Sequence, residues 1–206
     1  MRRTREGELY YSPSYKFEDL KKAINNGDKD KNKIIIMFKE RVKELYLEPA
    51  RLLIEHAKED RNMGFVFSAG LICVSVIDFF GRFYMGCPEK DVRSRFICWL
   101  LSYMRPPFDG YSANRFYEDF RNGLVHECRI KNGGEFSLSI QKPLVKREGY
   151  LVVNPKVLLE KIEDVFNKYL EDLRKNNILS EELINCLKKD FESDFSKNGR
   201  GDNDEG

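Results

Sequence analysis

The sequence predicts an all-α fold, a helical bundle with one small β-hairpin insert. Apolar residues recur at helical spacing along most of the chain, whereas signals for strands are confined to residues 135–153. The 206 residues, of which 41% are hydrophobic, suffice for one core without disulfides or metals. We therefore expect an N-terminal arm over residues 1–15, a single helical domain over residues 16–195 and a disordered tail over residues 196–206, which contains no apolar side chain.

Two helices are expected at the start of this domain. The first runs from about Phe17 to Asn25, because Asn26-Gly27 is a common helix stop. The second runs from Lys33 to about Asp60, where apolar side chains recur every three, four or seven residues. Its predicted buried stripe consists of Ile35, Phe38, Val42, Leu45, Leu52 and His56. Pro49 lies on that stripe and should kink or break the helix, because its ring clashes with the preceding turn.

The most apolar segment begins at Met63 and is uncharged as far as Ile77. Spanning a bilayer takes about 20 mostly apolar residues. Because this run is shorter and charges follow it, we expect a helix from Met63 to Tyr84 that is buried in a protein core, without membrane contact. Asp78 would then be a carboxylate among apolar neighbours and would need a partner. Arg82, one turn further on, and Arg121, across the bundle, are the two candidates.

Two more helices are expected before the strand signals. Cys87-Pro88 should open a helix that carries Trp99 and is closed by Pro106-Pro107. The next helix runs from Ser112 towards Glu127. On its expected buried side lie Phe116, Tyr117, Phe120 and Leu124.

The strand signals and the last two helices complete the domain. Residues 135–140 alternate in polarity after a Gly-rich turn, and residues 150–153 are β-prone, so these two runs should form the hairpin. Pro155 suits the first turn of a long helix that extends to Lys175. Ser180, followed by two glutamates, should cap a final helix.

Charge and cysteine content limit the classes of partner. The 36 Lys and Arg residues nearly cancel the 34 Asp and Glu residues, so any contact with nucleic acid must be local. The five cysteines are odd in number and form no Cys-x-x-Cys pair, which argues against a zinc site or a disulfide framework. No apolar run follows the basic N-terminus, so we expect no secretory signal and a cytoplasmic protein.

The chain has two histidines, and their contexts differ. His56 continues an apolar stripe, which favours a histidine in the core or at its boundary. His126 ends a helix beside a polar, Gly-rich loop, where a side chain can meet a substrate. At about 100° per residue, Asp119, Asn122 and His126 share the side opposite the apolar face. Arg121 lies about 140° round the helix from His126 by the same geometry.

On a straight helix, residues so far apart around the axis cannot bind one phosphate together. Two arrangements would still let Arg121 and His126 act on the same phosphate. Either the helix ends around Gly123, a weak helix former, or a second subunit completes the site. A third interpretation remains open, in which neither residue has a catalytic role. Arg121 would then pair with a carboxylate, and His126 would only end a helix.

The segment Arg121-Asn122-Gly123-Leu124-Val125-His126 resembles the motif of the HEPN superfamily, an arginine, commonly a polar residue, and a histidine after four to six residues. The resemblance covers this helix closely and the other helices only in general pattern, and the hairpin departs from it. It implies a helical, metal-independent ribonuclease without a cofactor. It also implies a homodimer whose interface unites the arginines and histidines of two chains.

The resemblance gives each residue of the motif a chemical role. His126 would exchange protons with the ribose 2′-OH or the 5′-oxygen, leaving a 2′,3′-cyclic phosphate, and Arg121 would bind the phosphate. Asn122 would orient the imidazole or bind the phosphate, Asp119 would fix the tautomer of His126, and Asp78 would support the site. Arg129 and Lys131 follow the motif and would form a basic rim for RNA, or an ordinary solvated loop.

Three classes of function remain. The first is an endoribonuclease that acts as a toxin or antiviral effector, as many relatives do, with RNA as substrate and an antitoxin or effector as a further partner. The second is a non-catalytic module of the same fold that binds RNA, a nucleotide or a protein. The third is a helical scaffold or dimerisation protein. Mutual proximity of Arg121 and His126 at the surface would disfavour the scaffold.

Overall fold

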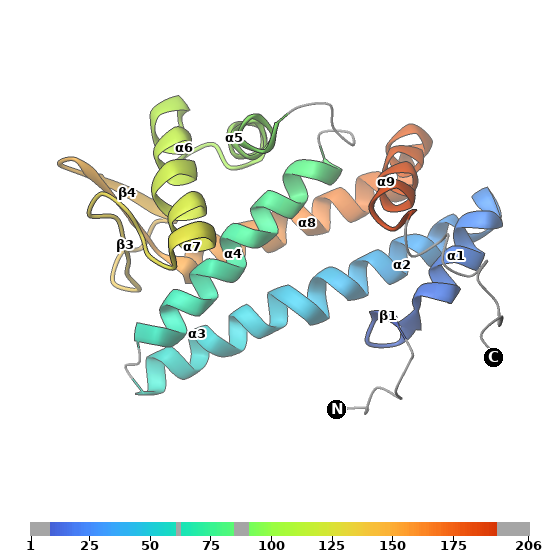
Figure 1. The fold of residues 1–206 in the computed structure, drawn as a ribbon, viewed down its shortest axis with the longest axis horizontal. Helices are drawn as coiled ribbons and strands as arrows, with labels where there is room; N and C mark the ends of the chain where they lie inside the picture. Colours follow the sequence, from blue (N-terminus) through green and yellow to red (C-terminus); the bar gives the residue numbers. More distant parts are fainter. Residues whose placement is uncertain (1–8, 61–62, 85–90, 193–206) are drawn as a thin grey trace, which may run out of the picture.

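The computed structural model describes residues 9–60, 63–84 and 91–192, and these residues are mostly helical, which confirms the predicted fold class (Figure 1). The helices are α1 (Phe17–Asn25), α2 (Lys31–Val42), α3 (Glu48–Asp60), α4 (Met63–Phe83), α5 (Val92–Tyr103), α6 (Gly110–Phe116), α7 (Asn122–Glu127), α8 (Pro155–Lys175) and α9 (Asn177–Asp190). The strands are β1 (Tyr10–Ser12), β2 (Tyr15–Lys16), β3 (Glu135–Phe136), β4 (Leu144–Arg147) and β5 (Tyr150–Val153). Cys87-Pro88 and the predicted tail lie outside the described residues.

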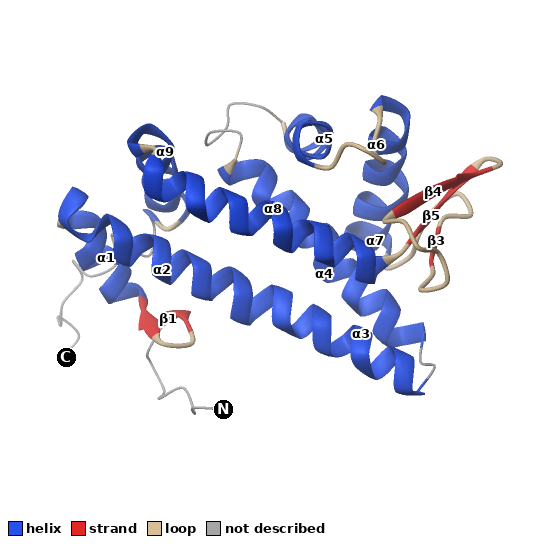
Figure 2. Ribbon diagram, turned by 180° about the vertical axis from the view of Figure 1, so that it is seen from behind, coloured by secondary structure: helices blue, strands red, loops and turns tan. Residues whose placement is uncertain are grey.

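Helix α4 is the centre of the bundle and packs against α3, α5 and α8. The rod formed by α2 and α3 runs along one side, with α8 beside it when the molecule is seen from behind (Figure 2). Helices α1 and α9 lie at one end of the molecule, and the sheet and α7 at the other. Within the described ranges, α4 alone is long and apolar enough to cross a membrane. A core helix meets the same criterion, so this is weak evidence for a membrane protein.

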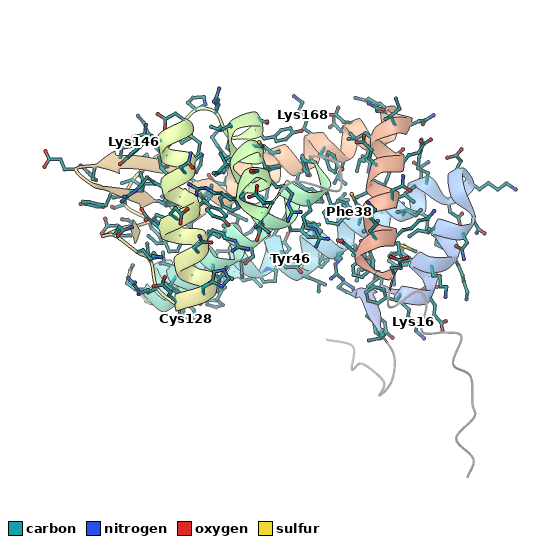
Figure 3. The ribbon with its side chains drawn as sticks, turned by 45° about the horizontal axis from the view of Figure 1, so that its top comes forward. Lys16, Phe38, Tyr46, Cys128, Lys146 and Lys168 are labelled. Carbon is teal, nitrogen blue, oxygen red and sulfur yellow. The ribbon has the colours of Figure 1, made fainter. Side chains whose placement is uncertain are left out.

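Aromatic side chains fill the core where α4 meets its neighbours. The ring of Phe80 lies 5.3 Å from that of Phe166 on α8 and 5.8 Å from that of Trp99 on α5. Phe38 on α2 packs against Phe83 and Phe166, and Figure 3 shows its side chain among the helices. Each such ring buries on the order of 150–250 Å² of surface. This cluster therefore fixes α2, α4, α5 and α8 relative to one another.

A π-helical turn at Lys43–Leu47 joins α2 to α3, and it corrects the predicted stripe. Leu45 and Leu52 are exposed by 44% and 53%, and His56 is exposed too, whereas the buried positions after the turn are Leu47, Ala50, Ile54 and Ala57. The N–H of Glu48 donates to the carbonyl of Lys43, so this turn contains one extra residue. An extra residue rotates the following face by about 100°. The turn immediately precedes Pro49, which lacks an N–H and crowds the turn before it.

The termini of the helices show which local sequence signals were sufficient to predict where a helix begins or ends. Helices α1 and α8 have the predicted bounds: Gly27 adopts φ 63° after the first, and Asn154 caps the second ahead of Pro155. The cap of α9 is Asn176, whose side chain accepts from the N–H of Leu179, so the prediction of Ser180 as the cap is wrong. In the described part of the predicted arm, β1 pairs with β2, which begins at Tyr15.

A three-stranded sheet, ordered β3-β5-β4, follows α7. Its hairpin joins β4 to β5 through Gly149 at φ 78°, and β3 pairs in parallel with β5, so residues 135–140 are not the hairpin partner that was predicted. Phe136 anchors the sheet: its ring lies 5.3 Å from that of Phe120. It also fills the space above Gly70, where a Cβ would lie 2.3 Å from the ring. The sheet thus buttresses α4 and the helix that carries Arg121.

Candidate functional site

Arg121 and His126 lie side by side in one chain. The Nη1 of Arg121 is 3.1 Å from Nε2 of His126, so the predicted separation on opposite parts of the helix is wrong. The helix departs from α geometry on both sides of the motif. The N–H of Asn122 donates to the carbonyl of Tyr117, and that of Cys128 donates to Gly123, each across five residues. The long side chain of Arg121 reaches His126 along α7, which continues past Gly123 to Glu127, so the helix does not end at Gly123.

A carboxylate from α4 holds the other edge of the guanidinium group. Oδ2 of Asp78 accepts from Nη2 of Arg121 at 2.8 Å and from its Nε at 3.2 Å. Of the two partners predicted for Asp78, Arg121 is therefore the one observed, and Arg82 instead pairs with Asp190. Only 13% of the Arg121 side chain is exposed, compared with 26% for Asp78. An ion pair this sheltered from water holds the guanidinium plane more firmly than a surface pair would.

The contact with Arg121 engages Nε2 of His126. Arginine has only N–H donors, so Nε2 is the acceptor of this hydrogen bond. His126 is exposed at the surface, and its Nε2 is the atom through which it can act as a base.

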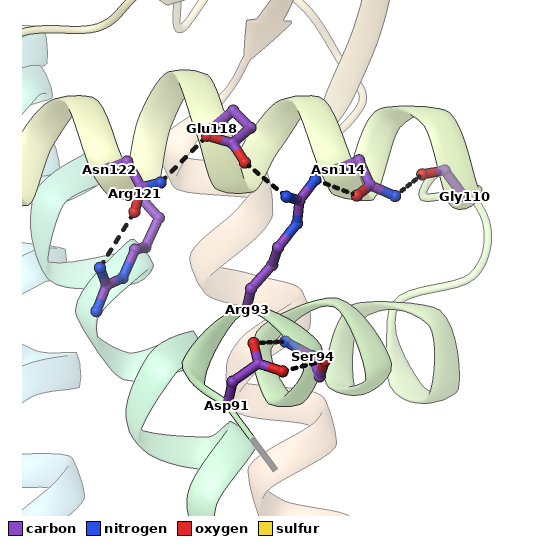
Figure 4. Close-up of polar contacts among 8 residues, drawn as sticks. All are labelled: Asp91, Arg93, Ser94, Gly110, Asn114, Glu118, Arg121 and Asn122. Carbon is purple, nitrogen blue, oxygen red and sulfur yellow. Dashed lines mark hydrogen bonds and ion pairs between the residues drawn. The ribbon is translucent and has the colours of Figure 1, made fainter.

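A chain of polar contacts extends from Arg121 along the helix surface (Figure 4). Asn122 accepts from Nη1 of Arg121 at 3.2 Å, and its Nδ2 donates to Glu118 at 3.2 Å. Glu118 also pairs with Arg93 on α5, at 3.2 Å. Asn122 thus orients Arg121, its neighbour in sequence, whereas no contact with the imidazole is observed. Sequence reasoning missed Glu118 and Arg93, although Glu118 precedes Asn122 by four residues, the spacing of neighbours on a helix.

Asp119 does not have the predicted position or role. It is fully buried, its Oδ2 lies 2.8 Å from Nε of Arg115, and its Oδ1 accepts from Asn132 at 2.6 Å. The reason is the loop after α7, which folds back over this side of the helix: the N–H of Lys131 donates to the carbonyl of Asp119. Asp119 anchors that loop, and its carboxylate is engaged away from His126.

Gly123 allows the loop to come this close. A Cβ at this position would lie 2.4 Å from the carbonyl oxygen of Arg129, a distance that no side chain tolerates. The chain reverses at Cys128, which adopts φ 52° and lies at the end of the motif helix (Figure 3). The glycine of the motif is therefore required for packing, whatever the chemistry of its neighbours.

The two predicted RNA-binding residues, Arg129 and Lys131, share one partner. Both pair with Glu127, at 2.6 Å and 2.8 Å. The hydrogen bond from Lys131 and the charge of Arg129 hold the pKa of the Glu127 carboxyl below its ordinary value. This local cluster neutralises part of the positive charge that the sequence placed beside the motif.

An open groove with a volume of about 430 Å³ lies between α4, α5 and α7. Arg121 and Asp78 form part of its wall, together with Arg82, Arg95 and the exposed Val125. Sequence reasoning did not find this groove, because its residues come from three helices that are distant in the sequence.

The described residues contain no group of three His, Cys, Asp or Glu side chains that could hold a metal ion. Cys73, Cys98, Cys128 and Cys186 are free thiols. At the site itself, the Arg121–His126 pair offers an imidazole that can exchange a proton beside a fixed cation.

Comparison of the chain with protein-family models, with curated proteins and with solved structures found no match in any of the three.

Proposed function

We propose that this protein is a metal-independent endoribonuclease of HEPN type. The observation that carries the proposal is the contact of 3.1 Å between Arg121 and His126, formed at the surface by residues whose spacing resembles the motif of that superfamily. Asp78 and Asn122 hold the guanidinium group of Arg121 in place. A scaffold protein would have no use for a base and a sheltered cation that meet beside an open groove.

The reaction that fits these groups is transesterification within RNA. Once the hydrogen bond from Arg121 to Nε2 of His126 is released, Nε2 removes the proton of a ribose 2′-OH, and the 2′-oxygen attacks the adjacent phosphorus. The bond from phosphorus to the 5′-oxygen breaks, and that oxygen takes up a proton from an imidazolium or from water. The products are a 2′,3′-cyclic phosphate and a 5′-hydroxyl. Arg121 offers its planar N–H edge to the phosphate oxygens, on which negative charge builds up in the transition state.

The setting of the reaction is part of the proposal. Two-fold dimers are the commonest homo-oligomers, and Val125, 45% exposed, gives the surface next to His126 an apolar side chain that a second copy would cover. Four free thiols fit a reducing cytoplasm. RNA is the substrate, and an antitoxin or effector would control a nuclease of this kind if it acts as a toxin or in antiviral defence.

One observation favours the second candidate, a non-catalytic module that binds RNA, a nucleotide or a protein. Arg121 already makes four hydrogen bonds, to Asp78, Asn122 and His126. Only one N–H of Arg121 is therefore left for a phosphate, and a two-pronged grip on the phosphate requires that an existing partner be displaced. In a binding module the same contacts would be permanent and purely structural.

Cleavage of RNA without metal tests the proposal. We expect the protein to cleave a mixed RNA pool in excess EDTA and to leave 2′,3′-cyclic phosphate ends, which are detected by their resistance to 3′-end labelling until the cyclic phosphate is opened and removed. His126→Ala should abolish cleavage, and Arg121→Lys should impair it severely, because the ammonium keeps the charge but loses the planar fork.

His56→Ala is the matched control, because His56 is the other histidine of the chain and is exposed on α3. This variant should cleave RNA as the parent does. If His126→Ala cleaves RNA as fast as His56→Ala and the parent do, His126 is not the base. Binding of RNA without cleavage by the parent would establish the non-catalytic module instead.

A further inference from the structure

Three arginine side chains line the groove beside the Arg121–His126 pair. Arg82 belongs to α4, Arg95 to α5, and Arg121 immediately precedes α7. The apolar side chains that complete the lining are Val74, Phe79, Val92 and Val125. At about 430 Å³ the groove is within the usual size range of ligand sites. A positively charged groove with aromatic side chains is the combination with which proteins bind single-stranded nucleic acid, and Phe79 is the aromatic residue of this groove.

The packing of α4 on α5 places two of these arginines together. Gly81 precedes Arg82, and a Cβ on Gly81 would lie 3.2 Å from the backbone carbon and oxygen of Arg95. This contact would be tighter than helices normally tolerate. The glycine therefore lets α5 approach α4 closely, and Arg82 and Arg95 enter the groove from neighbouring backbones.

The charges of the groove do not balance. Arg121 pairs with Asp78 and Arg82 pairs with Asp190, whereas the described residues offer Arg95 no hydrogen bond or ion pair, and its Nε is buried without an acceptor. Burial raises the pKa of Asp190, and the charges of both Arg82 and Arg95 oppose that rise, so the two guanidinium groups act on this one carboxylate. Three cations against two carboxylates leave one positive charge in excess. A partly buried charge without a partner is unfavourable, and an anion in the groove would supply the partner.

We propose that Arg95 binds a backbone phosphate of single-stranded RNA in this groove, next to the phosphate that Arg121 and His126 act on. The proposal rests on the proposed ribonuclease activity for the identity of the ligand, but it concerns binding and not chemistry. Arg95 thus extends the site from one phosphate to two. The apolar lining gives the intervening ribose and base a surface to lie on.

Binding of a single-stranded RNA that the protein cannot cleave tests this proposal. The probe is a fluorescein-labelled 2′-O-methyl oligonucleotide, which keeps the phosphates but lacks the attacking hydroxyl. Its affinity is measured by fluorescence anisotropy over a range of salt concentrations. Arg95→Gln should weaken binding about tenfold, and the slope of log K against log salt should become shallower by about 0.7, the value for one phosphate contact on a single strand.

Two further variants make the result specific. Arg105→Gln removes the same charge at an exposed position just after α5 that does not line the groove, and it should bind as the parent does. Arg95→Lys keeps the charge, so it should retain the parental salt slope even if the affinity falls. It also provides the comparison if Arg95→Gln melts too early to be measured.

Each outcome decides between the proposals. If Arg95→Gln matches the parent in affinity and slope, or if Arg95→Gln and Arg105→Gln change the slope equally, Arg95 is not a phosphate ligand. If the parent cleaves RNA but Arg95→Gln binds normally, the groove proposal fails and the ribonuclease stands. If the parent binds the probe through Arg95 but never cleaves RNA, the groove stands and the ribonuclease fails.

Discussion

Arg121 is the residue on which the site depends, and its hydrogen bonds divide between two tasks. Nε and Nη2 contact Asp78 on α4, and Nη1 contacts Asn122 and His126 on its own helix. Arginine has five N–H groups, so one remains for a substrate in this state. Asp78 therefore positions Arg121 and also competes with the phosphate for it.

This double role predicts a specific effect of Asp78→Asn. Removal of the negative charge should strengthen RNA binding, because Arg121 gains net attraction for phosphate. Cleavage at saturating RNA should fall about tenfold, because the guanidinium group is less firmly held, which amounts to about 1.4 kcal/mol. Steady-state kinetics should thus show a lower kcat together with a lower KM.

Asp164→Asn is the matched control, since Asp164 is exposed on α8. It should leave both kinetic constants unchanged. An Asp78→Asn variant with an unchanged kcat would show that Asp78 does not position Arg121 for catalysis. A raised KM would show that it does not compete with the substrate.

At the scale of the elements, regular helical periodicity predicted most of the fold and then failed at particular turns. The bounds of α1 and α8 follow from local stop and cap signals, such as Gly27 and Pro155. The exposure of Leu52 does not follow from helical periodicity, because the extra residue at Lys43–Leu47 rotates the buried face of the helix that follows. The extra residue can be recognised only when the buried positions are known. The buried Val42 is followed by the buried Leu47 five residues later, instead of three or four.

The same limitation affected the site. The motif residues Arg121, Asn122 and His126 could be found from their spacing, but helical periodicity gives only the direction in which a side chain leaves the helix, and not the reach that brings Arg121 to His126. Asp119 was misplaced because a loop that follows it in sequence covers it. Arg95 could not be found at all, because only the packing of α5 on α4 makes it part of the groove.

The role of Asp119 as an anchor of that loop predicts a large loss of stability for Asp119→Ala. The carboxylate is fully buried, and its removal leaves Arg115 without its ion-pair partner and Asn132 without its acceptor. Breaking a buried ion pair in this way costs about 3–5 kcal/mol. Urea unfolding should show this loss, whereas Asp164→Ala, on the surface of α8, should stay within about 0.5 kcal/mol of the parent.

A small loss in Asp119→Ala, comparable to that of Asp164→Ala, would contradict the anchoring role. Hydrogen exchange gives a second readout. The amide of Lys131, which donates to the carbonyl of Asp119, should exchange faster in Asp119→Ala than in the parent.

At the scale of the whole molecule, the proposal includes a homodimer. Light scattering at micromolar concentration should give twice the chain mass of 24.3 kDa. Val125→Lys should shift the population towards monomer, because it places a charge on the exposed surface beside His126. A parent that remains monomeric would contradict the dimer, and a fully dimeric Val125→Lys variant would place the interface elsewhere.

The central claim is that Arg121 and His126 of one chain act together, and mixing of variants tests it most directly. Arg121→Ala and His126→Ala proteins are each shown to be inactive in EDTA, then unfolded and refolded together, with subunit exchange verified by two affinity tags. Because the two side chains meet within one chain, no mixed dimer contains an intact pair, and we predict that no activity returns. With random pairing about half of the dimers are mixed, and a site built between chains would restore one of two sites in each. Recovery of about a quarter of the parental activity would therefore contradict the claim.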